Sequence, residues 1–287
     1  MVEYAVPEID YSRYSNRQLA AVPLAVLGLA ILIIAATWAT AGVPVALGTD
    51  FTSGSVMTVQ TDMSKSEIRS SFDQEIVSVQ GVQAAENQYV VTFESSDIDS
   101  IREAASNIGA IEVLGSSSTP ATFTEENQRL TLIGLAVAFL GMSILAFILF
   151  RTFVPSIAIV ISAFSDIVIP IALMNLFGMK LSLGIVAALL MLIGYSVDSD
   201  ILLNNHILRR SGDFYESTYR AMQTGVSMTV TSIAAMIVMA VLATFFGIDL
   251  MASIGLVLVF GLSADLMNTY LLNLSLLRWY KFEGVAR

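Results

Sequence analysis

Two aspartates, Asp198 and Asp200, lie in a stretch of sequence that is otherwise apolar enough to cross a bilayer. A carboxylate near the middle of a spanning helix costs about 2.5 to 3.5 kcal/mol on insertion scales, so it needs a partner, a water cavity or a transported ion. Successive helical residues turn by about 100°, which places these two side chains roughly 200° apart. We therefore expect Asp198 to share a face with Gly194, and Asp200 to share another face with Ser196 and Asn204, only one of which points into a helix bundle.

Two further aspartates also fall inside apolar stretches. Asp166 lies in one of them, and Asp265 lies in another, on the same helical face as Asn268 and Thr269. Each intramembrane acid is either an ion-coupling group on a conduction path or a protonated acid that forms hydrogen bonds between helices. The ion-coupling candidates, with the first as the leading one, are Asp198, Asp200, Asp166 and Asp265.

The composition indicates a membrane protein. Of 287 residues, 55% are hydrophobic and 13% are charged, with a mean hydropathy of +0.74, whereas soluble domains carry about 25% charged residues. With no cysteine and a single histidine, no disulfide, metal site or cofactor is expected. Six windows reach the roughly 20 residues that a membrane span needs: 19–41, 130–150, 153–177, 181–205, 226–246 and 250–274.

The basic residues near these windows predict the orientation. Arginine and lysine lie mainly before the first window, between the fourth and fifth, and after the sixth. By the positive-inside rule, both termini are then cytoplasmic and the chain is a multi-pass protein of the cell membrane. The first window is too long for the core of a signal peptide, so we expect an uncleaved anchor. The predicted organisation is a cytoplasmic segment (1–18), a first span (19–41), an extracytoplasmic domain (42–128), spans two to six (129–277) and a cytoplasmic tail (278–287).

The segment 42–128 has the pattern of an α+β domain. Strands are expected near 56–61, 76–84, 89–94 and 110–114, and helices from Ser64 and over 97–108, where Ser64 and Glu67 match a capping box. The order strand, helix, strand, strand, helix, strand predicts a ferredoxin-like fold. The longer loop at 206–225 includes the run 213–220, which is either a short interfacial helix with aromatic residues at the headgroups or a solvated connector.

The same external segment is strongly acidic. It contains thirteen acidic residues against three basic ones, so it carries the chain's whole net charge of −10. Such a surface could capture cations or a cationic partner, but it is also typical of a hydrated surface suited to high salt. The second interpretation is favoured, and it indicates a halophilic source.

Two motifs resemble the SecD/SecF family of protein-export subunits, within the resistance-nodulation-division superfamily. The run Gly-Thr-Asp-Phe-Thr-Ser-Gly at 48–54 resembles the family signature Gly-Ile-Asp-Phe-Thr-Gly-Gly, and Ile-Gly-Tyr-Ser-Val-Asp at 193–198 resembles the Ile-Gly-Tyr-Ser-Ile-Asn run in the fourth span of the SecF branch. The matching positions are Gly48, Asp50, Phe51 and Gly54 in the first motif and Gly194, Tyr195 and Ser196 in the second. With one span, an external domain and five more spans, the resemblance covers essentially the whole chain.

The resemblance implies an accessory subunit of protein export that is not an enzyme. It implies a SecD-like partner with six further spans, association with the SecY channel, contact with a translocating unfolded polypeptide and with membrane lipid, and no nucleic acid. Bacterial members are thought to use the proton gradient to pull on the emerging chain with their external domains. For this chain, both H⁺ and Na⁺ remain open as the driving ion.

The chain departs from the bacterial pattern at its charged positions. Bacterial SecF sequences have Asn, Asp and then Ser or Thr where this chain has Asp198, Ser199 and Asp200, so the acid is displaced by one residue. They also have Arg where Ser227 stands, in a window that carries no charge here. The pattern resembles the archaeal branch, and any counter-charge for the acids is left to the partner subunit.

Two other functions fit part of the pattern. A half-size exporter of lipids or small molecules would work as a homodimer, without a SecD-like partner. An intramembrane aspartyl protease could use paired aspartates on facing helices, but its Gly-x-Gly-Asp signature is absent from the sequence. The sequence favours protein export over both.

Overall fold

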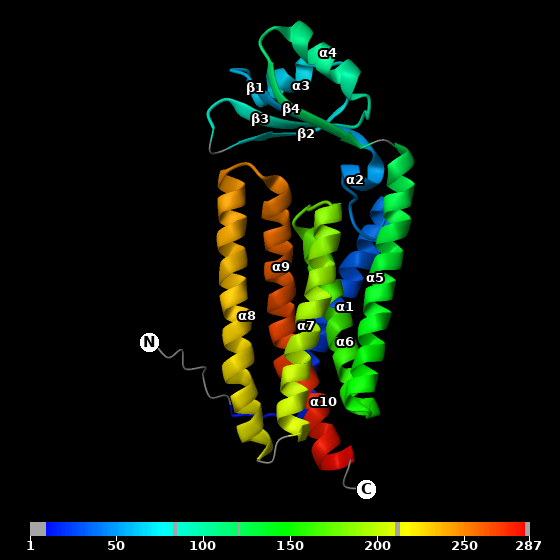
Figure 1. Cartoon of the computed structure of the whole chain (residues 1–287), viewed down its shortest axis with the longest axis vertical. Coiled ribbons are helices and arrows are strands. Elements are labelled where there is room, and N and C mark those ends of the chain that lie inside the picture. Colours follow the sequence, from blue (N-terminus) through cyan, green and yellow to red (C-terminus); the bar gives the residue numbers. More distant parts are fainter. Residues whose placement is uncertain (1–9, 83–84, 120, 210–212, 285–287) are drawn as a thin grey trace.

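The computed structural model describes residues 10–82, 85–119, 121–209 and 213–284, which form a helix bundle capped by a small α+β domain (Figure 1). Six helical stretches in these ranges are long and apolar enough to cross a membrane, and the α+β domain lies between the first and the second, as predicted. The spanning stretches are α1 (Asn16–Ala41), Glu126–Phe150 of α5 (Ala121–Phe150), α6 (Phe153–Leu176), Leu183–Leu208 of α7 (Leu183–Arg209), α8 (Phe214–Phe245) and the run Asp249–Gly284.

The last stretch is a composite helix. It comprises α9 (Asp249–Met267), a π-helical segment η2 (Asn268–Asn273), α10 (Leu274–Trp279) and a second π-helical segment η3 (Tyr280–Gly284). The chain therefore stays helical through most of the segment predicted as a tail, of which 285–287 lie outside the described residues.

The external domain has the predicted ferredoxin-like topology. Its elements are β1 (Gly54–Gln60), α3 (Lys65–Ser71), β2 (Ile76–Gly81), β3 (Gln88–Phe93), α4 (Ile98–Ile108) and β4 (Glu112–Thr119). The sheet order is β2-β3-β1-β4, and all neighbouring strands are antiparallel. The strand β3 thus lies between β1 and β2, and β1 lies between β3 and β4, which is the arrangement of two split βαβ units.

Alternating apolar residues form the core of this domain between the sheet and its two helices. Met57 and Val59 of β1 and Val91 of β3 point to one face, where they pack with Ile68 of α3 and Ile101 of α4. Both helices cover the face turned away from the membrane bundle (Figure 1). The open face of the sheet is therefore directed toward the ends of the spanning helices.

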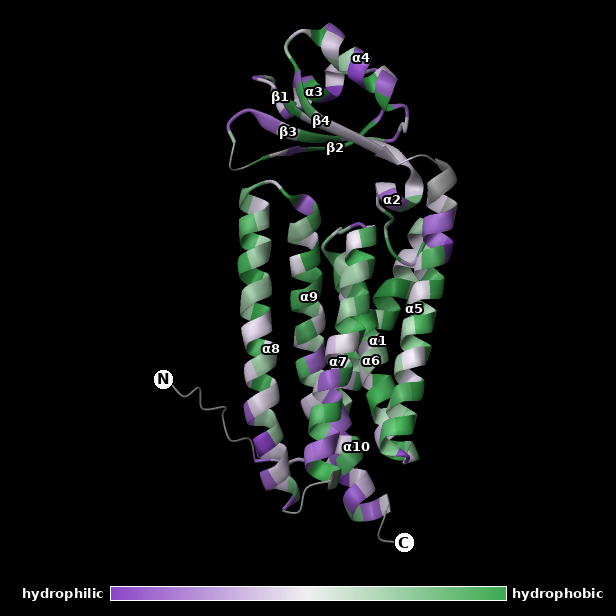
Figure 2. Cartoon of the chain, viewed as in Figure 1, coloured by the Kyte–Doolittle hydropathy of each residue, from purple (hydrophilic) through white to green (hydrophobic). Residues whose placement is uncertain are grey.

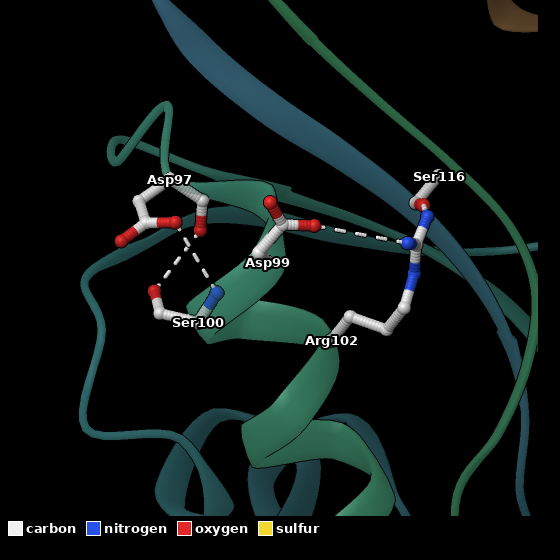
Figure 3. Close-up of polar contacts among 5 residues, drawn as sticks. All are labelled: Asp97, Asp99, Ser100, Arg102 and Ser116. Carbon is white, nitrogen blue, oxygen red and sulfur yellow. Dashed lines mark hydrogen bonds and ion pairs between the residues drawn. The ribbon is translucent and has the colours of Figure 1, made fainter.

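Local polar contacts begin and anchor the two helices. In α3, Ser64 and Glu67 form the predicted capping box, and the bond from the Ser64 backbone N–H holds the pKa of Glu67 below its usual range. This contribution is present at neutral pH and is lost as pH falls through the lowered pKa of Glu67. In α4, Asp97 accepts a bond from the Ser100 N–H (3.2 Å), as Figure 3 shows.

The strand β4 is longer than predicted. Arg102 of α4 donates to Ser116 (2.6 Å), and both residues are drawn in Figure 3. The serines at 116–118 pair with Met57, Val56 and Ser55 of β1. A run of serines is typical of a linker. It can still form an edge strand, because the backbone needs only a neighbouring strand for its hydrogen bonds. The predicted end of the second strand, at 83–84, lies outside the described residues.

The first family-like motif fastens the linker between α1 and β1 to the bundle. Gly48 donates to the Leu181 carbonyl (2.8 Å), and a Cβ at Gly48 would lie 2.8 Å from that oxygen, so only glycine permits this approach. The Asp50 carboxylate, at the start of α2 (Thr49–Thr52), accepts a bond from the Leu183 N–H (2.9 Å). Asp50 therefore supplies an N-terminal cap to α7 from a distant part of the chain.

The helix α5 holds the same motif from the other side. Asn127 donates to the Asp50 carbonyl (3.0 Å) and Gln128 to the Phe51 carbonyl (2.8 Å), while the Phe51 ring is 2% exposed. Gly54 adopts a φ of +140°, where an added Cβ would lie 2.7 Å from the Phe93 carbonyl oxygen. The motif thus connects the external domain, α5 and α7 at one point.

A second contact joins the domain to the turn between α8 and α9. Val82, just after β2, packs against Gly247. A Cβ added to Gly247 would lie only 2.6 Å from the Val82 side chain. When the Gln80 amide is oriented with its nitrogen toward Asp249, this nitrogen donates to the Asp249 carboxylate at 2.7 Å. The sheet is therefore held over two separate parts of the bundle.

The connection between α7 and α8 is shorter than predicted. The run 213–220 is neither a separate interfacial helix nor a connector, because α8 begins at Phe214 and continues unbroken into the span. Asp213 caps it by accepting from the Tyr215 N–H, and Phe214 is buried (2% exposed) rather than placed at the headgroups. Residues 210–212 lie outside the described residues.

The opposite end of the bundle is held by a buried arginine. Arg278 of α10 is 9% exposed and donates to the backbone carbonyls of Tyr11 (2.8 Å) and Tyr14 (2.6 Å) and to the Asn16 side chain. Burial raises the pKa of Tyr11 to about 12, and its hydroxyl contacts Met222 of α8. This clasp holds the helical residues 278–284 against the N-terminal segment.

We predict that Asp50→Ala loosens the start of α7. Loss of a helix cap costs about 1 kcal/mol, which corresponds to about fivefold faster local opening. Hydrogen exchange of peptides from the first turn of α7 in the full-length protein measures this change. Asp50→Asn keeps an acceptor oxygen and is the matched control; equal exchange in Asp50→Ala and in the unmodified chain would refute the capping role.

Candidate functional site

Three aspartates from three helices meet inside the bundle. Asp166 of α6, Asp200 of α7 and Asp265 of α9 are at most 1% exposed. Figure 2 shows hydrophilic positions on the halves of α7 and α9 that lie away from the external domain, within an otherwise apolar bundle. Carboxyl groups at such depth are costly unless they are hydrogen-bonded, so their partners define the site.

Asp166 is held by two short hydrogen bonds. Ser196 of α7 donates to its Oδ2 at 2.6 Å, and Asn268 of η2 donates to its Oδ1 at 2.6 Å. Each carboxyl oxygen thus has a donor from a different helix. Asp166 thereby ties α6 to α7 and to the last span.

Asp265 is bound through hydroxyl groups. Ser199 of α7 donates to its two oxygens at 2.9 and 3.1 Å, and Thr269 approaches Oδ1 at 3.4 Å. Ser199 thus joins α7 to α9 through the Asp265 carboxyl group.

Asp200 receives its donors on one oxygen. Thr269 (2.9 Å) and Asn273 (2.8 Å) both donate to Oδ1, and Asn204 donates to the Asp200 backbone carbonyl (2.7 Å). Since Thr269 also contacts Asp265, its hydroxyl bridges the two acids. Ser199, which binds Asp265, also donates to the backbone carbonyl of Ser196 (2.9 Å), whose side chain binds Asp166, so the three carboxyl groups belong to one network.

The π-helical segment η2 positions the donors of this network. Its i→i+5 bonding widens the turn, and Asn268, Thr269 and Asn273 are all fully buried on the side of the acids. Asn268 reaches Asp166, whereas Thr269 and Asn273 reach Asp200. Single-turn π segments are frequent at functional sites, because they redirect side chains that a regular helix would place elsewhere.

The network contains no basic side chain among the described residues. The ion pairs found among the described residues lie elsewhere and are exposed. They are Arg13–Asp10, Arg102–Asp99 and Arg220–Glu216. Ser227, where the family resemblance led us to look for a basic residue, donates to the Gln223 carbonyl of its own helix. Charge balance for three buried carboxyl groups therefore has to come from protons, from a bound cation or from another subunit.

Asp198 lies outside this network. As the 200° separation predicts, Asp200 points inward and Asp198 is exposed on the outer face of α7, together with Ala187, Met191 and Gly194. Within 4 Å of the position of a Cβ at Gly194 there is no atom. The role of Asp198 in ion coupling stays a prediction, and its position directs that role toward another molecule.

The remaining motif residues join the network or brace it. Ser196 binds Asp166, while the Tyr195 hydroxyl lies near Thr229 (3.3 Å) and Ser232 (3.5 Å) of α8. Asn273 is a member of the network that sequence reasoning missed, since its partner Asp200 lies on another helix. The available signal was its spacing of four residues from Thr269, which places both on one helical face.

Comparison with known proteins places the chain among protein-export subunits. Residues 100–283 match the family model for the C-terminal region of the protein-export membrane protein SecD/SecF. The protein-export membrane proteins SecF of Haloferax volcanii and Haloquadratum walsbyi are 64% and 60% identical, each over 100% of both chains. SecF of Methanolacinia petrolearia is 39% identical over 96% of this chain and 97% of its own.

A solved structure has the same fold. The crystal structure of SecDF, a translocon-associated membrane protein from Thermus thermophilus, covers 97% of this chain with a TM-score of 0.69 and 20% sequence identity. The match spans only 39% of that longer chain. Six spanning helices with the external domain after the first are therefore a shared architecture.

We predict that Thr269→Val destabilises the bundle. The substitution keeps the shape of the side chain but removes the hydroxyl that bridges Asp200 and Asp265, at a cost of about 0.6 to 1.7 kcal/mol for a hydrogen bond within a membrane. Thermal unfolding in detergent measures the loss. Thr231→Val is the control, since that exposed hydroxyl bonds only to its own helix; equal effects of the two variants would contradict the bridging role.

Proposed function

Because the chain belongs to the SecD/SecF family of protein-export membrane proteins, we propose that it is a SecF-type accessory subunit that promotes translocation of proteins across the cell membrane. The observation that supports this function is the 64% identity to the protein-export membrane protein SecF of Haloferax volcanii over the full length of both chains. The solved structure of SecDF has the same fold. These matches favour protein export over a half-size exporter of lipids or small molecules. The similarity to halophilic archaeal proteins also agrees with the acidic external domain.

No covalent chemistry is assigned to the chain. It has no cysteine, and its single histidine, His206, contacts the Leu202 carbonyl of its own helix (2.9 Å). The three buried acids are bound by neutral hydroxyl and amide donors that hold them in place. We therefore assign mechanical and ion-coupling work to the subunit, not catalysis.

The orientation follows from charge. The ends of the bundle that carry Arg13, Arg17, Arg220 and Lys281 face the cytoplasm, and the acidic α+β domain lies outside the cell. In this orientation the open face of the sheet looks back at the membrane (Figure 1). The domain is then in a position to contact an unfolded chain that emerges from the SecY channel.

The outer face of α7 is proposed to contact a SecD-like subunit. A carboxyl group at this depth is disfavoured against lipid, so the face that carries Asp198 requires a polar partner. The open space at Gly194, in line with Ala187, permits close approach of another helix. In the SecDF structure, the matched region is only 39% of the chain, which leaves room in the same molecule for such a partner.

Ion coupling is assigned to the network of buried acids. A proton or cation that binds one of these carboxyl groups changes the hydrogen bonds that the group accepts. These hydrogen bonds hold α6, α7 and α9 together. The same α7 is capped by Asp50 of the linker to the external domain. A change of helix packing at the acids can therefore reach the external domain through one rigid element.

We predict that Asp200→Asn lowers the gradient-dependent part of protein export at least fivefold, because the variant cannot change charge. Asp198→Asn should lower it less, since Asp198 lies outside the network. Translocation of a preprotein into membrane vesicles, with and without an ionophore, measures that part. Asp99→Asn, on the external surface, is the control; unchanged kinetics in Asp200→Asn would refute the coupling role.

We also predict that Gly194→Leu prevents stable association with the SecD-like subunit while the chain itself folds. A Cβ at this position has no atom of the chain within 4 Å, and the leucine side chain would occupy the space in which another helix would pack. Copurification of the two subunits after gentle solubilisation is the measurement. Gly141→Leu on α5 also enters open space and serves as the matched control; full copurification of Gly194→Leu would place the interface elsewhere.

A further inference from the structure

An apolar cluster lies next to the buried acids, on the side away from the external domain. Leu203 and Ile207 follow Asp200 on α7 at spacings of three and seven residues, which places all three on one helical face. Both apolar residues are at most 1% exposed, and they pack in one cluster with Tyr270 and Leu274 of the last span. Water that approaches Asp200 along α7 from this end therefore meets the cluster first.

The cluster is completed by a residue from outside the spanning helices. Tyr11 lies in η1 (Tyr11–Arg13), a short 3₁₀ turn before α1, and it is only 4% exposed within the cluster. Its hydroxyl contacts the Met222 sulfur of α8 at 3.4 Å. The segment that carries Tyr11 crosses the end of the bundle opposite the external domain (Figure 1). This N-terminal strap (residues 10–15) thus covers the cluster with one aromatic ring.

The strap is held by Arg278 without an ion pair. The guanidinium donates to the backbone carbonyls of Tyr11 (2.8 Å) and Tyr14 (2.6 Å) and to the Asn16 side chain, and within the described residues it pairs with no carboxylate. A buried charge that is bound only by neutral groups regains solvation when water reaches it. The Tyr11 hydroxyl gains as well, because sulfur is a weak acceptor. Hydration of these two groups therefore offsets part of the cost of releasing the strap.

Other contacts keep the helices in place when the strap is released. The capping box of Ser15 and Gln18 starts α1 without help from Arg278. Lys281 donates to the Ile207 carbonyl (3.3 Å) and lies 5.6 Å from the centre of the Phe214 ring, which ties the last span to α7 and α8. The strap can therefore detach while the bundle stays assembled.

We propose that the N-terminal strap is a releasable closure of the bundle. With Tyr11 seated in the cluster, water and solutes from the proposed cytoplasmic side are kept away from the acids, and release of the strap from Arg278 opens this path. The closure regulates the proposed ion coupling and rests on it for its biological role. The change in access itself is a property of the isolated chain.

The chain contains no cysteine, so one introduced thiol reports access to the cluster. The measurement is the rate at which a negatively charged methanethiosulfonate modifies Leu203→Cys in the full-length chain in lipid nanodiscs. We expect slow modification with the strap intact, and at least tenfold faster modification when Tyr11→Ala or Arg278→Gln is added. Tyr11→Phe keeps the ring and should keep the slow rate. Circular dichroism verifies that each variant is folded.

Two matched variants leave the closure in place. Tyr14→Ala removes a ring that is 50% exposed but keeps the backbone carbonyl that binds Arg278. Arg220→Gln removes an exposed arginine from α8. Neither should change the rate of modification. Equal rates in Tyr11→Ala and Tyr14→Ala overturn the proposal, and so does modification of Leu203→Cys alone that is as fast as that of Arg220→Cys.

Met222 gives a second measurement that needs no introduced cysteine. It is 4% exposed and its sulfur contacts Tyr11, so hydrogen peroxide should oxidise it slowly in the unmodified chain and at least fivefold faster in Tyr11→Ala. Mass spectrometry of peptides measures the sulfoxide. Equal oxidation of Met222 in the two chains overturns the closure even where a cysteine variant does not fold.

Both assays contain no export partner and no ion gradient, so they separate this proposal from the proposed function. Access that does not depend on the strap removes the closure and leaves the role in export intact. Access that depends on the strap, together with export that loses no gradient dependence in Asp200→Asn, would instead refute the coupling role and keep the closure.

Discussion

Three carboxyl groups buried in a membrane bundle without a basic side chain among the described residues constrain everything around them. Each has to be satisfied by neutral donors, and these donors come from α7 and η2. The requirement explains why a π segment interrupts the last span at Asn268, because it lets Asn268, Thr269 and Asn273 serve two acids on different helices. It also makes the packing of α6, α7 and α9 sensitive to any proton or cation that enters.

The helix α7 connects this network to the external domain. Its inner face carries Ser196, Ser199 and Asp200, and its first turn is capped by Asp50 from the linker that leads to the external sheet. Gly48 and Gln128 hold that linker so closely that a shift of α7 must be accommodated by the domain. The two family-like motifs, far apart in the sequence, therefore meet on one helix: the first caps the start of α7, and the second lies in its middle.

The external domain differs from the bundle in what stabilises it. Its core is a small apolar layer between a four-stranded sheet and two helices, and its surface carries the net charge of the chain. The spanning helices are mostly apolar, as Figure 2 shows, and they bury the carboxyl groups of Asp166, Asp200 and Asp265 between them.

Local patterns in the sequence determined the spans, the ferredoxin-like domain, the capping box of Glu67 and the opposite directions of Asp198 and Asp200, because hydrophobic periodicity and helix geometry act over a few residues. Only the tertiary structure decided that Asn273 meets Asp200, that Ser199 receives the carboxyl group of Asp265, and that Asp50 caps a helix more than a hundred residues away. It also made the run 213–220, predicted as either an interfacial helix or a connector, the start of α8, and the serine run at 116–118 part of a strand. These contacts join residues that are distant in the chain, and a polar side chain looks the same in the sequence whether it faces water or a partner on another helix.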